Sequence, residues 1–365
     1  VLHNDSGHTQ IIDAISTDHM FAGCTKFKFS SVLANLNIAS VTSLKGLLSG
    51  CETFAHSLPI VGTSVTDLTG TLEYSNFTNY IGNWNTSQVE SLESLFEGTS
   101  HTGGGINNWN VGKVESFKNT FKNNGTFNNF LNKWNTSSAT NMEGMFYNAS
   151  SFNKNIQTNN TSSRWQVTKV LNFKNMFNGA SSFNNWINKW EIGEGVSGNI
   201  ISMEGMFANS SFNKGIWYKN NSGSNNFWDT TKVISFKNMF KNNDTFNQSL
   251  NNWKTDNVTT MEGMFHGATA FDKGCNSWNT ANVESFKNTF NGATAFDQFI
   301  NNWNTSSATN MSKMFANKNY DKGLWKNGDK WNVGSVEDMS GMFENNATFN
   351  QGLSSWNPEK VSNFN

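Results

Sequence analysis

The sequence predicts a repeat solenoid built from stacked parallel β rungs, and three observations lead to this fold class. A short hydrophobic pair ending in Phe or Leu recurs about thirteen times in the 365 residues, at intervals of 24 to 33 residues. A charged residue near this pair alternates in sign from copy to copy, and aromatic residues recur with the same period. A fixed period between about 20 and 50 residues is typical of proteins whose repeats stack on one another.

The second residue of each pair anchors one copy of the repeat. The anchors are Phe21, Leu48, Leu72, Phe96, Phe121, Phe146, Phe177, Phe207, Phe240, Phe265, Phe290, Phe315 and Phe343. Because a rung can bury its apolar face only against its neighbours, we expect residues 1–365 to form a single continuous solenoid. In this solenoid residues 1–19 are a lead-in rung, residues 20–356 the repeats, and residues 357–365 the beginning of an incomplete rung.

Each copy is predicted to contain the same two short elements. Apolar residues spaced by three and four positions predict a helical turn or 3₁₀ segment, as at Val258, Met261, Met264, Phe265 and Ala268. A step rich in Asn and Gly then predicts a turn. Residues 271–278 predict one short strand, which we expect to pair in parallel with its neighbours at about 4.8 Å per rung, giving a stack on the order of 60 Å long.

The alternating charges form a column one position after a recurring hydrophobic residue. They are Glu93, Lys118, Glu143, Lys174, Glu204, Lys237, Glu262 and Lys287. In a parallel stack equivalent residues lie about 4.8 Å apart, so alternating charges attract where like charges would repel. The true repeat is then a doublet of about 50 residues. The alternative is a recent duplication of a two-rung segment without selection for charge pairing.

Rows of Phe and Trp are expected to stabilise the stack by burial. The Trp row consists of Trp109, Trp134, Trp165, Trp190, Trp253, Trp278, Trp303, Trp331 and Trp356. A Trp that recurs with the core period predicts a core position. The alternative is an exposed row on which carbohydrate stacks.

Extra residues lengthen four copies, at about 157–164, 191–199, 217–227 and 324–330. The first, third and fourth inserts follow the same rung position, after FNK or YDK, so we expect them to project from one edge as loops. Trp217, Tyr218 and Trp325 lie in these inserts, outside the core register. They are the predicted interaction residues. The alternative is that they only pack their loops against the rod.

Several segments resemble a known group of repeats. MFAGCTKF (residues 20–27) and LLSGCETF (residues 47–54) are similar to the AF-x-GC-xx-L element of BspA-type leucine-rich repeats. NMEGMFYNASSFN (residues 141–153) and NMSKMFANKNYDKGLW (residues 310–325) resemble the roughly 25-residue repeats of mycoplasmal, bacterial and protist surface proteins. The resemblance runs from about Met20 to the end. It implies a leucine-rich-repeat-like solenoid, a cell-surface or secreted setting, a role in adhesion, and no catalytic residues.

Cys24 and Cys51 occupy the same place in adjacent rungs, in AGC and SGC. Equivalent Cα atoms about 4.8 Å apart are within the range of a disulfide, so we expect a bridge if the chain is secreted. The alternative is two buried thiols. Cys275 replaces an aliphatic residue and is predicted to be a buried thiol.

N-x-[ST] triplets recur at fixed rung positions and predict N-glycans in rows. Asn124, Asn148, Asn209, Asn243 and Asn346 follow the Phe pair, Asn85, Asn135 and Asn304 follow the Trp, and Asn159 and Asn220 lie in inserts. For the column after the Trp, the alternative is a buried Asn ladder of leucine-rich-repeat type. Its replacement by Gln166, Glu191 and Lys254 favours an exposed position.

The composition and the missing motifs restrict the function. The net charge is -1, with 26 basic and 27 acidic residues, which argues against a nucleic-acid partner. No run of 18 apolar residues predicts a membrane span. The six His are scattered, and no metal, cofactor or catalytic signature occurs, so we expect neither a cofactor nor an enzyme.

The sequence therefore predicts a glycoprotein scaffold, extracellular or on the cell surface, that mediates adhesion or interaction with other surface or extracellular proteins or glycans. The first alternative is a structural subunit of a fibril or surface layer, a homopolymer assembled end to end through uncapped solenoid ends. A third and weaker alternative is carbohydrate binding through the aromatic residues of the inserts.

Overall fold

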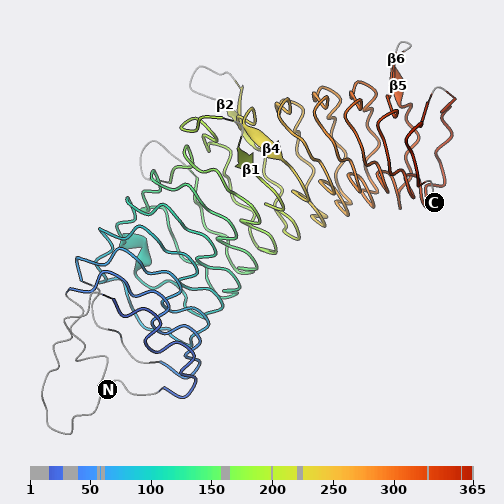
Figure 1. The fold of residues 1–365 in the computed structure, drawn as a ribbon. Coiled ribbons are helices and arrows are strands. Elements are labelled where there is room, and N and C mark those ends of the chain that lie inside the picture. The colour runs from blue at the N-terminus through green and yellow to red at the C-terminus, as the bar shows by residue number, and fades with distance from the viewer. Residues whose placement is uncertain are drawn as a thin grey trace, which may run out of the picture. The chain divides into compact units, whose positions relative to one another are not determined.

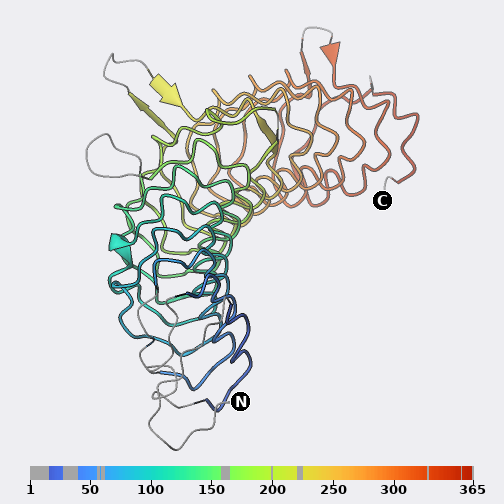
Figure 2. The same cartoon turned by 60° about the vertical axis from the view of Figure 1, so that its left-hand side comes forward.

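The structure is a computed structural model, and it describes residues 16–27, 40–55, 58, 62–157, 165–198, 200–219, 225–326, 329–354 and 356–363. The chain divides into two compact units, unit 1 (Val1–Gln166) and unit 2 (Val167–Asn365). The repeat continues through this boundary without a change of motif, so the sequence did not predict the division. The rungs of each unit appear as successive turns of chain in Figures 1 and 2.

Regular secondary structure is sparse among the described residues. Unit 1 holds the 3₁₀ helix η1 (Ile106–Asn108), and unit 2 holds β1 (Ile201–Ser202), β2 (Trp217–Lys219), β3 (Asn225–Phe227), β4 (Val233–Ser235), β5 (Trp325–Lys326) and β6 (Asp329–Lys330). Strand β1 pairs in parallel with β4, whereas β2–β3 and β5–β6 are antiparallel hairpins. The two hairpins coincide with the third and fourth inserts, and both stand out from unit 2 in Figures 1 and 2.

A polar residue in each rung makes a parallel bridge to the next rung. The bridges connect Ser16, Ser43, Asp67, Ser91, Ser116 and Asn141 in unit 1, and Asn172, Ser202, Ser235, Thr260, Ser285, Asn310, Asp338 and Asn363 in unit 2. A polar side chain is favoured here because its oxygen accepts a hydrogen bond from the N–H two residues on. Asn141 Oδ1 accepts from Glu143 N at 3.0 Å in this way. The same residue therefore closes a turn and sets the register between rungs.

The predicted strand at residues 271–278 is wrong, because the described structure has no strand there. The N–H of Asp272 bonds to a side chain of the preceding rung, and the same contact recurs one rung further on. Asp272 N donates to Asn247 Oδ1 at 3.0 Å, and Asp297 N donates to Asp272 Oδ1 at 3.1 Å. The parallel bridges lie earlier in the repeat, at Thr260 and Ser285.

The predicted helical segment is a pair of turns. Two residues in each rung, on either side of the anchor Phe, have positive φ; around Phe265 they are Gly263 (61°) and Gly267 (69°). An α-helix cannot run through two left-handed residues that lie four positions apart. Gly263 N therefore donates across the rungs to Lys287 O, at 2.8 Å. The spacing of three and four reflects turns with i to i+3 hydrogen bonds, such as Met264 N to Met261 O at 3.0 Å.

Asn and Gly alternate at the first of these two positions. The residues are Asn119 and Gly144 in unit 1, and Asn175, Gly205, Asn238, Gly263 and Asn288 in unit 2. The side-chain oxygen of each Asn occupies the place where a Cβ would lie if the Gly of the next rung were replaced by another residue. A Cβ on Gly205 would lie 2.3 Å from Asn175 Oδ1, and one on Gly263 would lie 2.3 Å from Asn238 Oδ1. Ser94 before Asn119 and Lys313 after Asn288 end the alternation.

Aromatic rows form the core of both units. Anchor rings of neighbouring rungs stack, as at Phe96–Phe121 (5.5 Å between centroids) and Phe240–Phe265 (5.7 Å). The described Trp residues of the row from Trp109 to Trp331 are at most 3% exposed, and Trp303 Nε1 donates to Cys275 O at 2.9 Å. The Trp row from Trp109 to Trp331 thus belongs to the core and offers no exposed surface for carbohydrate, whereas Trp356 in the last rung is half-buried.

Candidate functional site

The charge column is stacked rung on rung. Ser94 N donates to Lys118 O and Asn119 N to Glu143 O, which places Lys118 between Glu93 and Glu143. In unit 2 ion pairs form between Lys174 and Glu204 (3.3 Å) and between Lys237 and Glu262 (3.2 Å). The paired side chains are 30–45% exposed. Pairs this exposed contribute at most about 1 kcal/mol each.

A polar groove of about 510 Å³ follows this column in unit 2. It is lined by Lys174, Asn175, Asn178, Glu204, Gly205, Ala208, Asn209, Lys237, Asn238, Lys241 and Asn242. Its Asn side chains bond to one another, since Asn209 Nδ2 donates to Asn178 Oδ1 (2.9 Å) and Asn242 Nδ2 to Asn209 Oδ1 (3.0 Å). These amides hold the rungs together and offer little to a ligand.

The predicted disulfide between Cys24 and Cys51 is absent, and both residues are free thiols. Cys24 is exposed, whereas Cys51 is buried and its Sγ donates to Phe21 O at 2.9 Å. Burial raises the pKa of Cys51 to about 11. Cys275 is also a buried thiol, as predicted from its place in the rung.

The sequons after the Phe pair occupy two different positions. Asn148 and Asn209 lie two residues after the anchor and are exposed. Asn124 and Asn243 lie three residues after it and are fully buried. Asn243 Nδ2 donates to Phe212 O at 3.0 Å, and its Oδ1 accepts from Phe246 N at 3.0 Å. The prediction that Asn124 and Asn243 carry glycans is wrong, because their amide nitrogens face the core.

Asn346 takes the same position as Asn243 but is half-buried, and its Nδ2 donates to Tyr320 O at 3.2 Å. Of the sequons after the Trp, Asn85 and Asn135 are half-buried and Asn304 is exposed. Asn159 and Asn220 lie outside the described residues.

Among the predicted insert aromatics, the structure describes the side chain of Trp217, which is 40% exposed. Its carbonyl oxygen accepts from Asn188 Nδ2 at 2.8 Å, which ties β2 to the preceding rung. Tyr218 lies in β2 and Trp325 in β5, and their side chains are outside the described residues.

Within the described ranges, exposed aromatic rings lie beside a Lys of the next rung at three places. We call these the aromatic–lysine pairs: Phe130 with Lys154, Trp186 with Lys214, and Phe299 with Lys322. The distances from Nζ to the ring centroid are 4.9, 5.4 and 5.6 Å. The rings are 51%, 47% and 54% exposed, although each lies three residues after a buried core Phe.

Sequence reasoning missed the rings but contained a signal for the Lys. Each of the three Lys residues belongs to the FNK or YDK motif that precedes an insert. Tyr80 holds the ring position in an earlier rung and is 65% exposed, but it faces Gly82 and Gly105. A Cβ on these glycines would lie 2.4 and 2.5 Å from the Tyr80 side chain.

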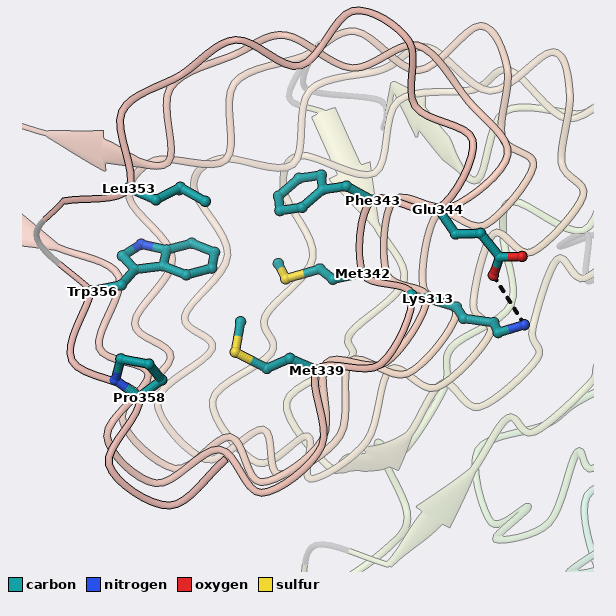
Figure 3. A pocket seen from close by; sticks show the side chains of 9 residues that line it. Lys313, Met339, Met342, Phe343, Glu344, Leu353, Trp356 and Pro358 are labelled. Carbon is teal, nitrogen blue, oxygen red and sulfur yellow. Dashed lines mark ion pairs between the residues drawn. The ribbon is translucent and has the colours of Figure 1, made fainter. Parts of the chain in front are cut away.

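An apolar pocket of about 700 Å³ lies in the last described rungs of unit 2. Met339, Met342, Leu353 and Trp356 point into it, and the Lys313–Glu344 ion pair (3.1 Å) lies at its rim (Figure 3). The equivalent Met residues of earlier rungs in unit 2, such as Met264 and Met314, are fully buried.

The described ranges contain no cluster of His, Cys, Asp or Glu that would hold a metal ion. They also contain no helix of the length and apolarity needed to cross a membrane. His101 is buried and stacks on Phe77 (6.0 Å) and Phe96 (4.9 Å), and burial lowers its pKa. It therefore replaces a core Phe.

Comparison with known proteins gives one match. A family model described as "Mycoplasma protein of unknown function, DUF285" matches residues 8–69, 63–164, 157–227, 201–327 and 318–365. No curated protein and no solved structure matches the chain. The overlapping matches agree with the resemblance to mycoplasmal repeats, and they name neither BspA-type nor leucine-rich repeats. Because they cover nearly the whole sequence, the chain belongs to the DUF285 family of Mycoplasma proteins of unknown function.

Proposed function

We propose that this chain is a non-enzymatic scaffold, extracellular or on the cell surface, whose units are leucine-rich-repeat-like solenoids that present a binding face to a partner. The observation that carries the proposal is that the rungs differ in their surface features and not in their core. Buried positions repeat from rung to rung, whereas the exposed rings and the β2–β3 and β5–β6 hairpins occur only in certain rungs. A uniform frame with local surface variation suits recognition.

Three further points support this reading. The resemblance to BspA-type and mycoplasmal surface repeats implies adhesion to other surface or extracellular proteins or to glycans. Four charged residues of the column, Lys174, Glu204, Lys237 and Glu262, form ion pairs with one another, which is a structural use of charge. The exposed sequon Asn304 is accessible to glycosylation in an extracellular setting.

The location is tested by labelling intact cells of the source organism with a membrane-impermeant amine reagent. Exposed lysines such as Lys169 should be labelled before lysis. Labelling that appears only after lysis would overturn a surface location.

The binding role is tested with hairpin-replacement variants of the full chain. Residues 271–278 show that a rung closes with Asn-Ser between Cys275 and Trp278. Replacing residues 217–227 by Asn-Ser therefore gives an uninserted rung, and residues 325–330 can be replaced in the same way. We expect weaker binding to host cells or matrix, with an unchanged circular dichroism spectrum. Undiminished binding by both variants would exclude the hairpins from the binding face.

The fibril or surface-layer alternative predicts a different picture. Negative-stain images of native material should then show regular filaments, whereas the scaffold predicts separate particles.

A further inference from the structure

We infer that the aromatic–lysine pairs are subsites for an anionic glycan, a sugar chain whose pyranose rings carry carboxylate or sulfate, with Trp186 and Lys214 as the principal subsite. The inference rests on the proposed binding role and names the class of partner. No motif in the sequence assigns such a site.

The first step concerns the rings. Trp186 is 47% exposed, although the Trp residues of the core row are at most 3% exposed. An aromatic face left in water forgoes the stabilisation that burial would give. Core packing does not explain this position, since Ile187 next to it is fully buried and faces the core. A flat, exposed indole face is the surface on which the apolar side of a pyranose packs.

The second step concerns charge. Lys214 Nζ lies 5.4 Å from the Trp186 ring centroid, and none of the ion pairs among the described residues includes Lys214 or Lys154. A Lys ammonium beside an aromatic ring can still attract a carboxylate or sulfate on a sugar that packs against that ring. Lys322 differs, because it also pairs with Asp297 at 2.9 Å. We therefore rank the Phe299–Lys322 subsite below the other two.

The third step concerns the neighbourhood of Trp186. Trp217, at the start of β2, is 40% exposed and lies one rung further on. A Cβ on Gly215 would lie 3.3 Å from Trp217 Nε1, so the glycine leaves room for this indole. Asn188 Nδ2 fixes the Trp217 carbonyl at 2.8 Å. Two exposed indoles thus lie on neighbouring rungs, Trp186 beside Lys214 and Trp217 beside Gly215, as a sugar chain longer than one unit requires.

The fourth step concerns recurrence. Each of the three Lys residues precedes an insert, so ring, Lys and insert occur together. The rung at residues 271–278 carries Lys273 but no insert, and the preceding rung has Ser249 in place of the ring. In unit 2 the Trp186 and Phe299 subsites are four rungs apart, roughly 19 Å at 4.8 Å per rung. Repeated subsites suit a polymer. Isolated rings at this separation do not form the continuous apolar patch of a protein interface.

The test is calorimetric titration of the full chain with three oligosaccharides: a heparin fragment (sulfated), a hyaluronan fragment (carboxylated) and a dextran fragment (neutral). We expect the anionic ligands to bind and to weaken as salt increases. Trp186→Ala and Lys214→Gln should each weaken binding about tenfold, because each removes one part of the subsite. The heparin and hyaluronan arms show whether sulfate or carboxylate is preferred.

Tyr80→Ala is the matched control, since Tyr80 is an exposed ring in the same rung position without a Lys partner, and it should bind like the wild type. Equal binding of dextran would overturn the anionic part of the inference. Absence of glycan binding would overturn all of it, even if surface labelling and cell binding succeed. A Trp186→Ala variant that loses self-association, measured by light scattering, would show that the occupant is a second copy of the chain.

Discussion

Single asparagine residues take different structural roles in the rung, and their distance from the anchor Phe decides which. Two residues after the anchor, Asn209 is exposed, has a φ of 52° and bonds to Asn of neighbouring rungs. Three residues after the anchor, Asn243 is buried and bonds to backbone groups. A one-residue shift therefore separates a surface amide from a core amide, although both are N-x-[ST] sequons.

We predict that Asn243→Ala lowers the free energy of unfolding by about 1–3 kcal/mol, because the N–H of Phe246 and the carbonyl of Phe212 lose their buried partner. Thermal unfolding followed by circular dichroism should show a lower midpoint. Asn302→Ala, at an exposed position, is the control and should leave the midpoint unchanged. Equal midpoints for the two variants would contradict the buried role.

Lys318 takes the place of Asn243 in another rung and is 3% exposed. Its Nζ donates to Phe296 O and lies 4.8 and 5.0 Å from the Phe296 and Tyr320 ring centroids. Burial lowers the pKa of Lys318 to about 7, and the negative charges of Asp297 and Asp272 oppose this shift only in part. Burial also raises the pKa of Tyr320, which keeps that phenol neutral.

We predict that stability rises with pH above about 7. The folded-state pKa of Lys318 lies below its ordinary 10.5, so the unfolded chain binds more protons between these values and the cost of burying the charge falls as pH increases. Lys318→Met should raise the melting temperature near pH 7 and reduce the further rise toward about pH 10. Lys169→Met is the exposed control. The same pH dependence in all three proteins would remove Lys318 as its source.

At the scale of the rung, the stacking order was predictable and the local backbone was not. Alternating charges such as Lys237 and Glu262 reveal which residues are neighbours, because parallel stacking brings equivalent positions together. Spacing cannot distinguish a helix from consecutive turns, since both place Met261 and Met264 on one face. The positive φ of Gly263 and Gly267 decides for turns. Residue spacing gives no sign that Trp186 is exposed, because its neighbour Ile187 is buried in the core.

We predict that Lys237→Glu destabilises the chain by roughly 1 kcal/mol or less, because an exposed ion pair becomes a repulsion. Adding Glu204→Lys and Glu262→Lys should recover part of the loss, and high salt should reduce both effects. Lys169→Glu is the control, because Lys169 is exposed and belongs to none of the ion pairs among the described residues. Failure of the triple variant to recover any stability would show that the column sets no register.

At the scale of the whole molecule, rungs of two kinds follow one another through much of unit 2. Rungs with Lys and Asn, such as Lys237 and Asn238, alternate with rungs that have Glu and Gly, such as Glu262 and Gly263. Charge and side-chain volume therefore alternate together. A rung of one kind packs better against a rung of the other kind than against a rung of its own kind.

We predict that removing residues 262–286, one rung, destabilises the chain more than removing residues 237–286, two rungs. The shorter deletion places Asn288 beside Asn238, where a Cβ on Gly263 would already lie 2.3 Å from Asn238 Oδ1. It also places Lys287 beside Lys237. The melting temperature of the one-rung deletion should be lower than that of the two-rung deletion. The reverse order would contradict the steric basis of the doublet.

The alternation has a consequence for how such a gene changes. Tandem repeats gain and lose copies by recombination, and among the alternating rungs from Asn119 to Asn288 a change by an even number of copies keeps Asn beside Gly at each junction. A change by an odd number creates one junction between rungs of the same kind, at a cost in folding. We therefore expect length variants of this chain to differ in steps of two copies. Packing between Asn and Gly would then favour an even change in the number of copies.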